Sequence, residues 1–392
     1  PFPAMEDDGM PHYERVTERL KACIALPTPN PPGDVEPVAA WIEAFARDIG
    51  ARADRQTVEP GKDNVIVTLE FGDGPCLVWN THMDVNNPNG QRWSHPPYEP
   101  VERDGRLYGL GACDAKGSLA AMMCAMERLA RDPGGVRGRL VLTAVMGEEA
   151  GGIGSLHLVR QGLRADGAVV GEPTQLTAAI AHKGTYMRRI RFRGRAAHSG
   201  RPELGINAIS HAARFVLEVD RLNARLQQAK HPLLGAASTA VTVMQGGTRQ
   251  NTIPNAAELI LDRRLIPGQT HADADAELAA LFAAVRETAP DLDVESVETI
   301  VATIPSETPA DARIVAAALQ AIRDVRGAPA EPVGFRAGCD MSKLVTIAGI
   351  PTVILGPGSL EQAHAPDEYV EIAQLEQAVS IYERLARLFL GG

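Results

Sequence analysis

The stretch Cys76-Leu77-Val78-Trp79-Asn80-Thr81-His82-Met83-Asp84 joins a short apolar run directly to His82 and Asp84. An unbroken apolar run of this length is typical of a strand that is buried on both faces of a sheet. The chain contains further runs of the same kind: Val65–Leu69, Leu140–Val145, Ala168–Val170 and Pro351–Leu355. The sequence therefore predicts a central sheet that is mostly parallel.

Helical patterns separate these runs. Val38, Ile42, Phe45 and Ile49 recur at helical spacing, and Gly50 follows where a helix cap is expected. Ser118–Ala130 and Asp311–Val325 are also helical in character. Because strands and helices alternate, we predict an α/β fold with the sheet between helices, in a doubly wound arrangement.

The middle of the chain has a different pattern. Tyr186–Arg193 alternates apolar and basic residues, Ile206–Leu226 is helical, and Ala240–Met244 and Ala257–Leu261 resemble strands. The length of 392 residues also favours two domains. We predict a main domain formed by residues 1–183 and 300–392, with a smaller α+β domain, residues 184–299, inserted into it.

Composition excludes several classes of partner. The formal net charge is −10 and the basic residues form no cluster, which argues against nucleic acid. The apolar runs are too short to span a membrane. The N-terminal stretch Pro1–Pro11 lacks the basic start and apolar centre of a signal peptide, so a cytoplasmic location is expected, although the missing initiator Met leaves a trimmed precursor open.

Five cysteines form no CxxC pair. Their odd number and their spacing argue against both a disulfide framework and a thiolate metal site. We find no sequence argument for a reactive thiol at Cys113 or Cys339, and we expect buried packing for these two residues. Any metal must therefore be held by histidines and carboxylates.

Polar residues follow four of the apolar runs. These are His82-Met83-Asp84, Gly147-Glu148-Glu149, Gly171-Glu172 and a glycine loop that extends from Gly356 to His364. Ligands of open α/β sheets bind outside the carboxyl ends of the strands, so these side chains are expected to converge. Taken alone, each has a simpler interpretation, such as a helix cap for Asp114 or solvated charge for Glu148-Glu149.

Together these motifs resemble the family of di-zinc acetylornithine deacetylases, succinyl-diaminopimelate desuccinylases, aminoacylases and glutamate carboxypeptidases. The resemblance covers nearly the whole chain. It rests on the following segments: Pro27–Gly33, His82–Asp84, Gly109–Gly117, Gly147–Glu149, Gly171–Thr174, Ala197–Ser199, Asn251–Pro254 and Gly356–Glu368.

The resemblance implies a centre with two zinc ions, for which cobalt or manganese could substitute. His82 and Glu172 would bind one ion, Glu149 and His364 would bind the other, and Asp114 would bridge both. A metal-bridging hydroxide would be the nucleophile. Glu148 would be the general base.

The resemblance also assigns supporting roles. Asp84 would accept the far imidazole proton of His82, and the peptide bond after Asp114 would be cis. In the inserted domain, His198 would stabilise the oxyanion, and Arg264 and Asn251 would bind the substrate carboxylate. The backbone of Gly356 would approach the substrate, or would only form a turn. The inserted domain would act as a lid and form a homodimer.

The implied activity is hydrolysis of the amide bond of a small N-acyl amino acid. A dipeptidase, a carboxypeptidase or an N-carbamoyl amino-acid amidohydrolase would use the same metals, and a metal-binding protein without turnover is a further alternative. Leu110, Ala115 and Cys339 differ from the residues usual in the family. These differences leave the acyl group and the amino-acid side chain open.

Overall fold

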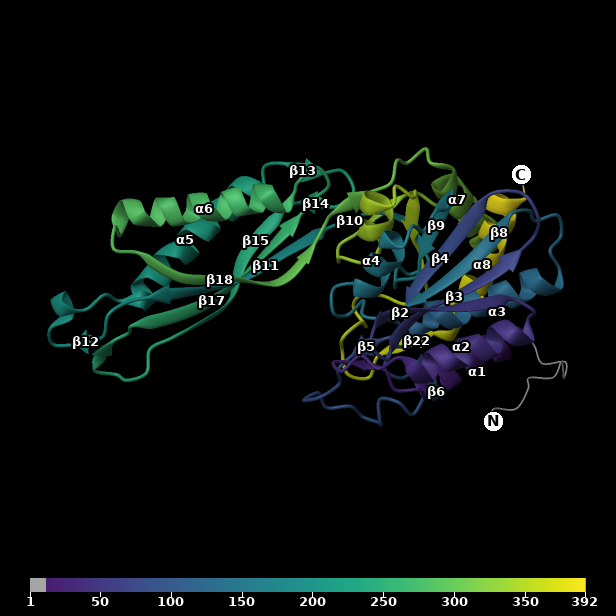
Figure 1. Cartoon of the computed structure of the whole chain (residues 1–392), viewed down its shortest axis with the longest axis horizontal. Coiled ribbons are helices and arrows are strands. Elements are labelled where there is room, and N and C mark those ends of the chain that lie inside the picture. Colours follow the sequence, from purple (N-terminus) through teal and green to yellow (C-terminus); the bar gives the residue numbers. More distant parts are fainter. Residues whose placement is uncertain (1–11, 392) are drawn as a thin grey trace. The chain divides into compact units, whose positions relative to one another are not determined.

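A computed structural model describes residues 12–391, which form two compact units (Figure 1). The first contains the chain up to Ile180, Thr308–Phe335 and the chain from Cys339 onward, and the second contains Ala181–Glu307 and Arg336–Gly338. The prediction made for Pro1–Pro11 lies outside the described residues. Within the described part of the chain, no helix is long and apolar enough to cross a membrane.

The first unit is built on a mixed sheet. Its strands, in order, are β10 (Ala179–His182), β21 (Thr352–Ile354), β9 (Gly167–Val170), β4 (Cys76–His82), β8 (Arg139–Val145), β3 (Lys62–Glu70) and β2 (Arg52–Glu59), with β20 (Val333–Phe335) paired to β10. β19 (Ser306–Glu307), which pairs with the last two residues of β10, belongs to the second unit. The central strands β21, β9, β4 and β8 are parallel. The predicted strands are therefore present, and the α/β class is confirmed.

The run Val65–Leu69 departs from the predicted parallel arrangement. It belongs to β3, which is antiparallel to both β2 and β8. Only Pro60-Gly61 separates β2 from β3, with Gly61 at φ 77°, and a connection this short can join only antiparallel neighbours. The sheet is consequently mixed, with a parallel centre and antiparallel edges.

Helices cover both faces of this sheet. They are α1 (His12–Ile24), α2 (Glu36–Asp48), α3 (Lys116–Arg131), α4 (Ile153–Arg160), α7 (Arg313–Arg326) and α8 (Ile372–Leu390), together with the π-helix η2 (Lys343–Ile347). On one face of β4 the Trp79 ring lies 5.6 Å from the Tyr382 ring of α8, and on the other face Asn80 donates to Ser155 of α4. This double cover explains why every residue of β4 is buried.

Short strands tie the surrounding loops together. β1 (Pro29–Asn30) pairs with β5 (Val85–Asn86), and β6 (Val101–Arg103), β7 (Arg106–Tyr108) and β22 (Tyr369–Glu371) form a small sheet. The pairing of β22 with β7 is antiparallel. It brings the segment after His364 next to the segment that leads to Asp114.

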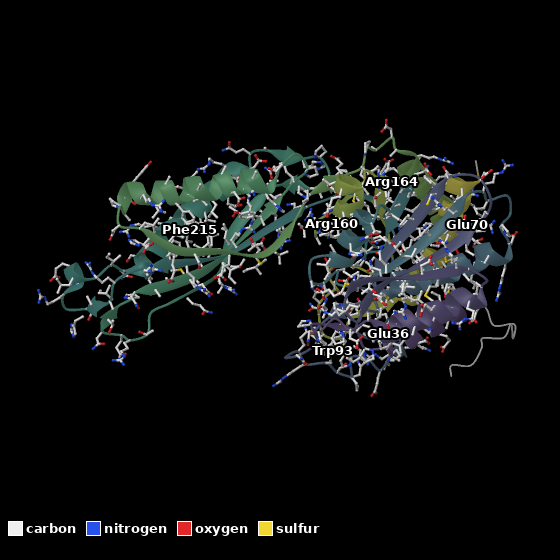
Figure 2. The ribbon with its side chains drawn as sticks, viewed as in Figure 1. Glu36, Glu70, Trp93, Arg160, Arg164 and Phe215 are labelled. Atoms are coloured by element: carbon white, nitrogen blue, oxygen red, sulfur yellow. The ribbon has the colours of Figure 1, made fainter. Side chains whose placement is uncertain are left out.

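The second unit has its own sheet and core. An antiparallel sheet runs β15 (Ser238–Gly246), β17 (Ala256–Leu265), β11 (Gly184–Arg193) and β18 (Asp293–Thr303), and the remaining elements are α5 (Ala208–Leu226), α6 (His271–Thr288), η1 (Pro202–Leu204), β12 (Ala197–His198), β13 (Lys230–His231), β14 (Gly235–Ala236) and β16 (Thr252–Ile253). Phe215 of α5, labelled in Figure 2, packs against Phe192 and Phe282 in the core.

The alternation predicted for Tyr186–Arg193 has a structural cause. Ile190 and Phe192 are buried in this core, whereas Arg191, which points to the other face, binds Glu258 of β17 and Glu298 of β18 at 2.8 and 2.9 Å. One face of the sheet is covered and the other is charged, as the period of two requires.

Candidate metal centre

The carboxyl ends of three parallel strands bring the predicted site residues of the first unit together. His82 is the last residue of β4, Glu148 and Glu149 follow β8, and Glu172 follows β9. β4 pairs in parallel with both β8 and β9, so the three strands end at one edge of the sheet. This is the arrangement expected for a ligand site in an α/β sheet.

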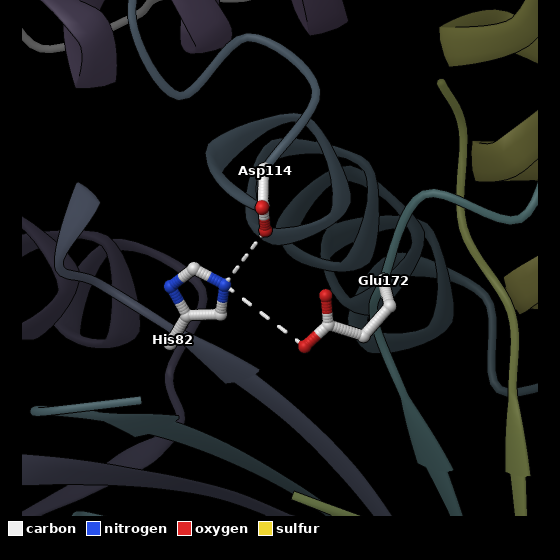
Figure 3. A group of neighbouring side chains, drawn as sticks. All are labelled: His82, Asp114 and Glu172. Carbon is white, nitrogen blue, oxygen red and sulfur yellow. Dashed lines mark hydrogen bonds and ion pairs between the residues drawn. The ribbon is translucent and has the colours of Figure 1, made fainter. Parts of the chain in front are cut away.

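His82, Asp114 and Glu172 form the first group (Figure 3). Nε2 of His82 lies 3.1 Å from Oδ1 of Asp114 and 4.0 Å from Oε1 of Glu172. Asp114 is supplied by the loop before α3, whereas the other two side chains come from strand ends. The three potential ligand atoms lie within 4.8 Å of one another, which is close enough to hold one metal ion.

Asp114, Glu149 and His364 form the second group. Nε2 of His364 lies 3.3 Å from Oδ2 of Asp114 and 3.1 Å from Oε2 of Glu149. Asp114 thus presents one carboxylate oxygen to each group. The five residues of the two groups are the ones for which the resemblance implies metal binding, and their role as ligands stays a prediction.

The donor set suits a divalent cation. It consists of imidazole nitrogens and carboxylate oxygens, which are the atoms that zinc accepts in the absence of thiolates. Oε1 of Glu149 is buried and has no hydrogen-bond partner among the described residues. A buried carboxylate oxygen without a partner is costly, and a bound cation would satisfy it.

The pKa shifts of the clustered histidines and carboxylates indicate that this position favours positive charge. Burial would lower the pKa of His82, but Asp114 and Glu172 raise it well above its usual value. Hydrogen bonds with Asp114 and Glu149 raise the pKa of His364 to about 11. Burial raises the pKa of Glu172 and of Glu149. Hydrogen bonds to His364 and His82 instead hold the pKa of Asp114 well below its usual value, so in the metal-free protein Asp114 stays ionised between two histidines that favour the charged form.

Asp84 positions its neighbours differently from the prediction. Nδ1 of His82 donates to the backbone carbonyl of Asp84 at 2.8 Å, while the Asp84 carboxylate lies 3.8 Å away. That donation leaves Nε2 of a neutral His82 as the acceptor that a metal needs. The carboxylate instead accepts the backbone N–H groups of Glu148 and Glu149, both at 3.2 Å, and the amide of Asn30 at 2.8 Å.

Glu148 immediately precedes Glu149 of the second group and is half-buried. Burial and the charge of Asp340 raise its pKa to about 8. Asp340 is itself buried, accepts from Ser155 at 2.6 Å and pairs with Lys343 at 3.0 Å. Sequence reasoning did not assign Asp340 or Lys343 to the site, because neither stands next to a predicted ligand in the chain.

The loop from Gly109 to Ala115 carries the shared carboxylate. The Asp114–Ala115 peptide bond is cis, as the resemblance implied. The Glu368 carboxylate accepts backbone N–H groups of this loop. Glu368 ends the Gly356–Glu368 motif, and a glutamate four residues after His364 gives no local sign in the sequence that it is buried.

Both backbone polar groups of Gly356 form hydrogen bonds within the fold. Its N–H donates to Oγ1 of Thr174 at 3.1 Å, and its carbonyl accepts from Leu176 at 3.0 Å. A Cβ here would lie 2.4 Å from Oγ of Ser118 and 2.6 Å from the backbone oxygen of Glu172. The glycine is thus required for close packing beside Glu172, and a substrate contact stays a prediction.

In the second unit, His198 and Asn251 lie together. Both are exposed, and the antiparallel pair β12–β16 joins their segments, with the N–H of Ser199 donating to the backbone oxygen of Asn251 at 2.9 Å. Nδ1 of His198 accepts the N–H of Gly200 at 3.0 Å. The neutral ring therefore carries its proton on Nε2, where it can donate outward.

Arg264 lies elsewhere in the second unit. It stands near the end of β17, and the strand between Ala256 and Arg264 spans about 26 Å at the usual rise per residue. Its guanidinium binds Asp262 through two nitrogens at 2.9 Å and donates to Thr185 at 3.0 Å. The neighbouring Arg263 is buried and pairs with Glu277 at 2.8 Å.

All five cysteines are free and buried. Sγ of Cys113 donates to the backbone oxygen of Ser359 at 3.2 Å. Burial raises the pKa of both Cys113 and Cys339, which disfavours the reactive thiolate form. The expectation of buried packing for Cys113 and Cys339 is confirmed.

Comparison with known proteins identifies the family. Residues 78–388 match the profile of Peptidase family M20/M25/M40, and the chain belongs to this family. Acetylornithine deacetylase of Proteus mirabilis is 32% identical over 357 residues, covering 90% of this chain and 88% of that protein. The predicted family and the predicted class, an enzyme that hydrolyses amide bonds, are confirmed.

Solved structures share the fold. An M20 family metallo-carboxypeptidase from Sulfolobus solfataricus has a TM-score of 0.80 at 18% identity, over 95% of this chain and 99% of that chain. A dinuclear metal binding peptidase of the M20 family from Bacillus subtilis has a TM-score of 0.72 at 16% identity, over 97% of this chain and 98% of that chain. At this identity the likeness concerns the fold.

Proposed function

We propose that this protein binds two zinc ions and hydrolyses the amide bond of a small N-acyl amino acid, in the manner of acetylornithine deacetylase. The observation that carries the proposal is the position of Asp114, whose two oxygens face two separate ligand groups. The similarity to acetylornithine deacetylases over most of the chain supports the substrate class.

The two groups divide the metal ligands between them. His82 and Glu172 would hold one ion, Glu149 and His364 the other, and Asp114 would contact both. When bound, zinc ions supply a Lewis acid for the amide carbonyl and bring the pKa of water down to about 7. The shared fold with a dinuclear metal binding peptidase from Bacillus subtilis supports a pair of ions.

Glu148 moves the proton in the proposed reaction. Its carboxylate takes a proton from the attacking water and then gives it to the departing amine, which balances the hydrolysis. Burial and Asp340 raise the pKa of Glu148 to about 8 in the metal-free protein, and bound cations would lower it again, so that the carboxylate could accept a proton near neutral pH. Asp84 orients this glutamate, because its carboxylate holds the backbone N–H groups of Glu148 and Glu149.

Residues of the second unit would act on the substrate. His198 presents an Nε2–H, which is the donor that a developing oxyanion requires. Arg264 and Asn251 would bind the substrate carboxylate, and Arg264 would have to exchange part of its contact with Asp262 to do so. A lid function of this unit, the homodimer and the cytoplasmic location likewise stay predictions.

A peptidase activity is the second candidate. The structures that share this fold include a metallo-carboxypeptidase and a peptidase, whereas the similar sequences are named as deacetylases. The same residues cleave either amide. A panel of N-acetyl, N-succinyl and N-carbamoyl amino acids and dipeptides, followed by detection of the released amine, would separate these activities.

Glu148→Gln tests the mechanism. Loss of the proton acceptor should lower kcat about 10²- to 10⁴-fold on the best substrate of the panel, with two zinc ions still bound. Glu361→Gln, at an exposed position in the loop that carries His364, is the matched control and should keep wild-type turnover. Wild-type kcat in Glu148→Gln would contradict the role of this residue.

A further inference from the structure

Glu368 lies behind the shared ligand without belonging to either metal group. Its side chain is buried, and both carboxylate oxygens accept backbone N–H groups. Oε2 accepts from Gly111 at 3.0 Å, and Oε1 accepts from Cys113 at 2.8 Å and from Asp114 at 3.0 Å. One carboxylate thus fixes the backbone on both sides of Ala112 and at Asp114 itself.

The loop around Asp114 depends on this contact. Gly111 has a φ of 84°, and a Cβ there would lie 2.6 Å from a methyl group of Val85, so the backbone packs too closely for a side chain. Buried N–H groups without an acceptor are costly, and these three N–H groups use the Glu368 carboxylate. Without it the loop would have to move to find other acceptors.

The same segment also carries His364, the exposed ligand of the second group. Asp367, next to Glu368, accepts from the N–H and the hydroxyl of Ser94 at 2.8 and 3.0 Å. Gln91 donates to the backbone oxygen of His364 at 3.1 Å. The segment His364–Glu368 is therefore fixed to the loop of Asp114 at one end and to the 91–94 segment along its length.

We propose that Glu368 is a positioning residue, which holds the backbone of Asp114 so that its two oxygens face two metal ions and which ties the loop of His364 to that position. The inference rests on the proposed two-metal function. Glu368 acts through Asp114 and His364 and touches neither substrate nor metal. Its expected signature is therefore a change in metal affinity and metal geometry.

Two variants distinguish the effect of the position of the Glu368 carboxylate from the effect of its charge. Glu368→Gln keeps the shape but has one acceptor oxygen, so its NH2 group must face at least one backbone N–H. Glu368→Asp keeps the charge but is one methylene shorter and cannot reach all three N–H groups. Glu371→Gln is the matched control, because Glu371 lies three residues further along the chain, in β22, and pairs with Arg106 at 2.9 Å.

The test is a titration of chelator-treated protein with Zn²⁺ and with Co²⁺. We expect both Glu368 variants to bind the ions about 10- to 100-fold more weakly than the wild type, and to change the visible absorption spectrum of bound Co²⁺. Glu371→Gln should match the wild type in both measurements. Thermal unfolding of the metal-free variants reports their stability separately.

Each outcome decides a different point. Wild-type affinity and spectrum in Glu368→Asp with losses only in Glu368→Gln would make the effect one of charge and overturn the proposal. Failure of both variants to fold with metal present would make Glu368 a structural residue and also overturn it. If the wild type binds fewer than two ions, the proposed function fails; if it binds two and the variants are unaffected, only this inference fails.

Discussion

The two ligand groups share Asp114 but differ in how the fold holds the rest. The side chains of His82 and Glu172 are 1% and 7% exposed and follow directly from strands β4 and β9. His364 is 52% exposed, has a φ of 60° and lies on a long loop. The first group is therefore part of the core, whereas the second is completed by a loop that other side chains must hold.

This difference shows how a sheet edge and two loops together form the candidate metal centre. Parallel strands place His82, Glu172 and Glu149 at one edge without further help. Asp114, which both candidate groups share, and the exposed His364 come from loops, and Glu368 connects those loops through backbone hydrogen bonds. Variants of the shared, buried and exposed ligands should accordingly have different effects.

Asp114→Asn should have the largest effect. The substitution keeps the shape of the side chain but removes the charge that faces both groups, so we expect both ions to bind more than about 100-fold more weakly. This loss of affinity is greater than the one expected from a residue that only orients a metal ligand. Activity should fall to background. Metal analysis and the released-amine assay check this, with the exposed Asp311→Asn as control; two tightly bound ions would show that Asp114 is not shared.

The buried and exposed histidines provide the direct contrast. In metal-free protein, His82→Ala should lower the free energy of unfolding by about 3–5 kcal/mol, since it leaves buried carboxylates without their partner. His364→Ala should cost less than about 1 kcal/mol, as expected for an exposed ion pair. Each variant should bind one ion tightly. Urea unfolding measures the costs, and equal values would remove the distinction between the groups.

The pH dependence of metal binding should show the smallest effect. Asp114 and Glu149 raise the pKa of His364 to about 11, so a metal must displace a proton there at neutral pH. Apparent zinc affinity should fall about tenfold for each unit of decreasing pH per displaced proton. The slope of zinc affinity against pH gives the number of displaced protons, and in His364→Ala this number should fall by about one. Calorimetric titrations from pH 6 to 8 measure the slope, and an unchanged value would contradict the assignment.

The metal-free fold should respond to pH in the opposite sense. A raised histidine pKa stabilises the folded state fully below the unfolded value of about 6.5. That stabilisation is lost as the pH rises toward about 11. Exposure of His364 limits its size through solvent screening.

Much of the fold could be predicted because it depends on local patterns. The apolar run in β4 and the helical spacing in α2 identify their elements directly, and the alternation in β11 reflects one covered face. The antiparallel direction of β3 could not be derived from its own apolar run, because a buried strand has the same composition in either direction.

The residue types of the candidate metal centre were likewise visible in the sequence. Histidines and carboxylates that directly follow apolar strands indicate a site by chemistry and position alone, and family resemblance supplied the pairing of ligands with ions. The sequence could not show which atom of Asp84 meets His82, since a backbone carbonyl and a carboxylate two residues on are both within reach.

The sequence by itself determined the α/β class, the family and the chemistry of the ligands, because these depend on periodicity and on motifs within short stretches. Only the tertiary structure decided that Glu368 secures the loop of Asp114, that Asp340 and Lys343 lie behind Glu148, and that Arg263 is buried. Each of these contacts joins residues that lie on different loops or elements of the chain. The sequence around a residue does not show which distant residue it contacts in the folded protein.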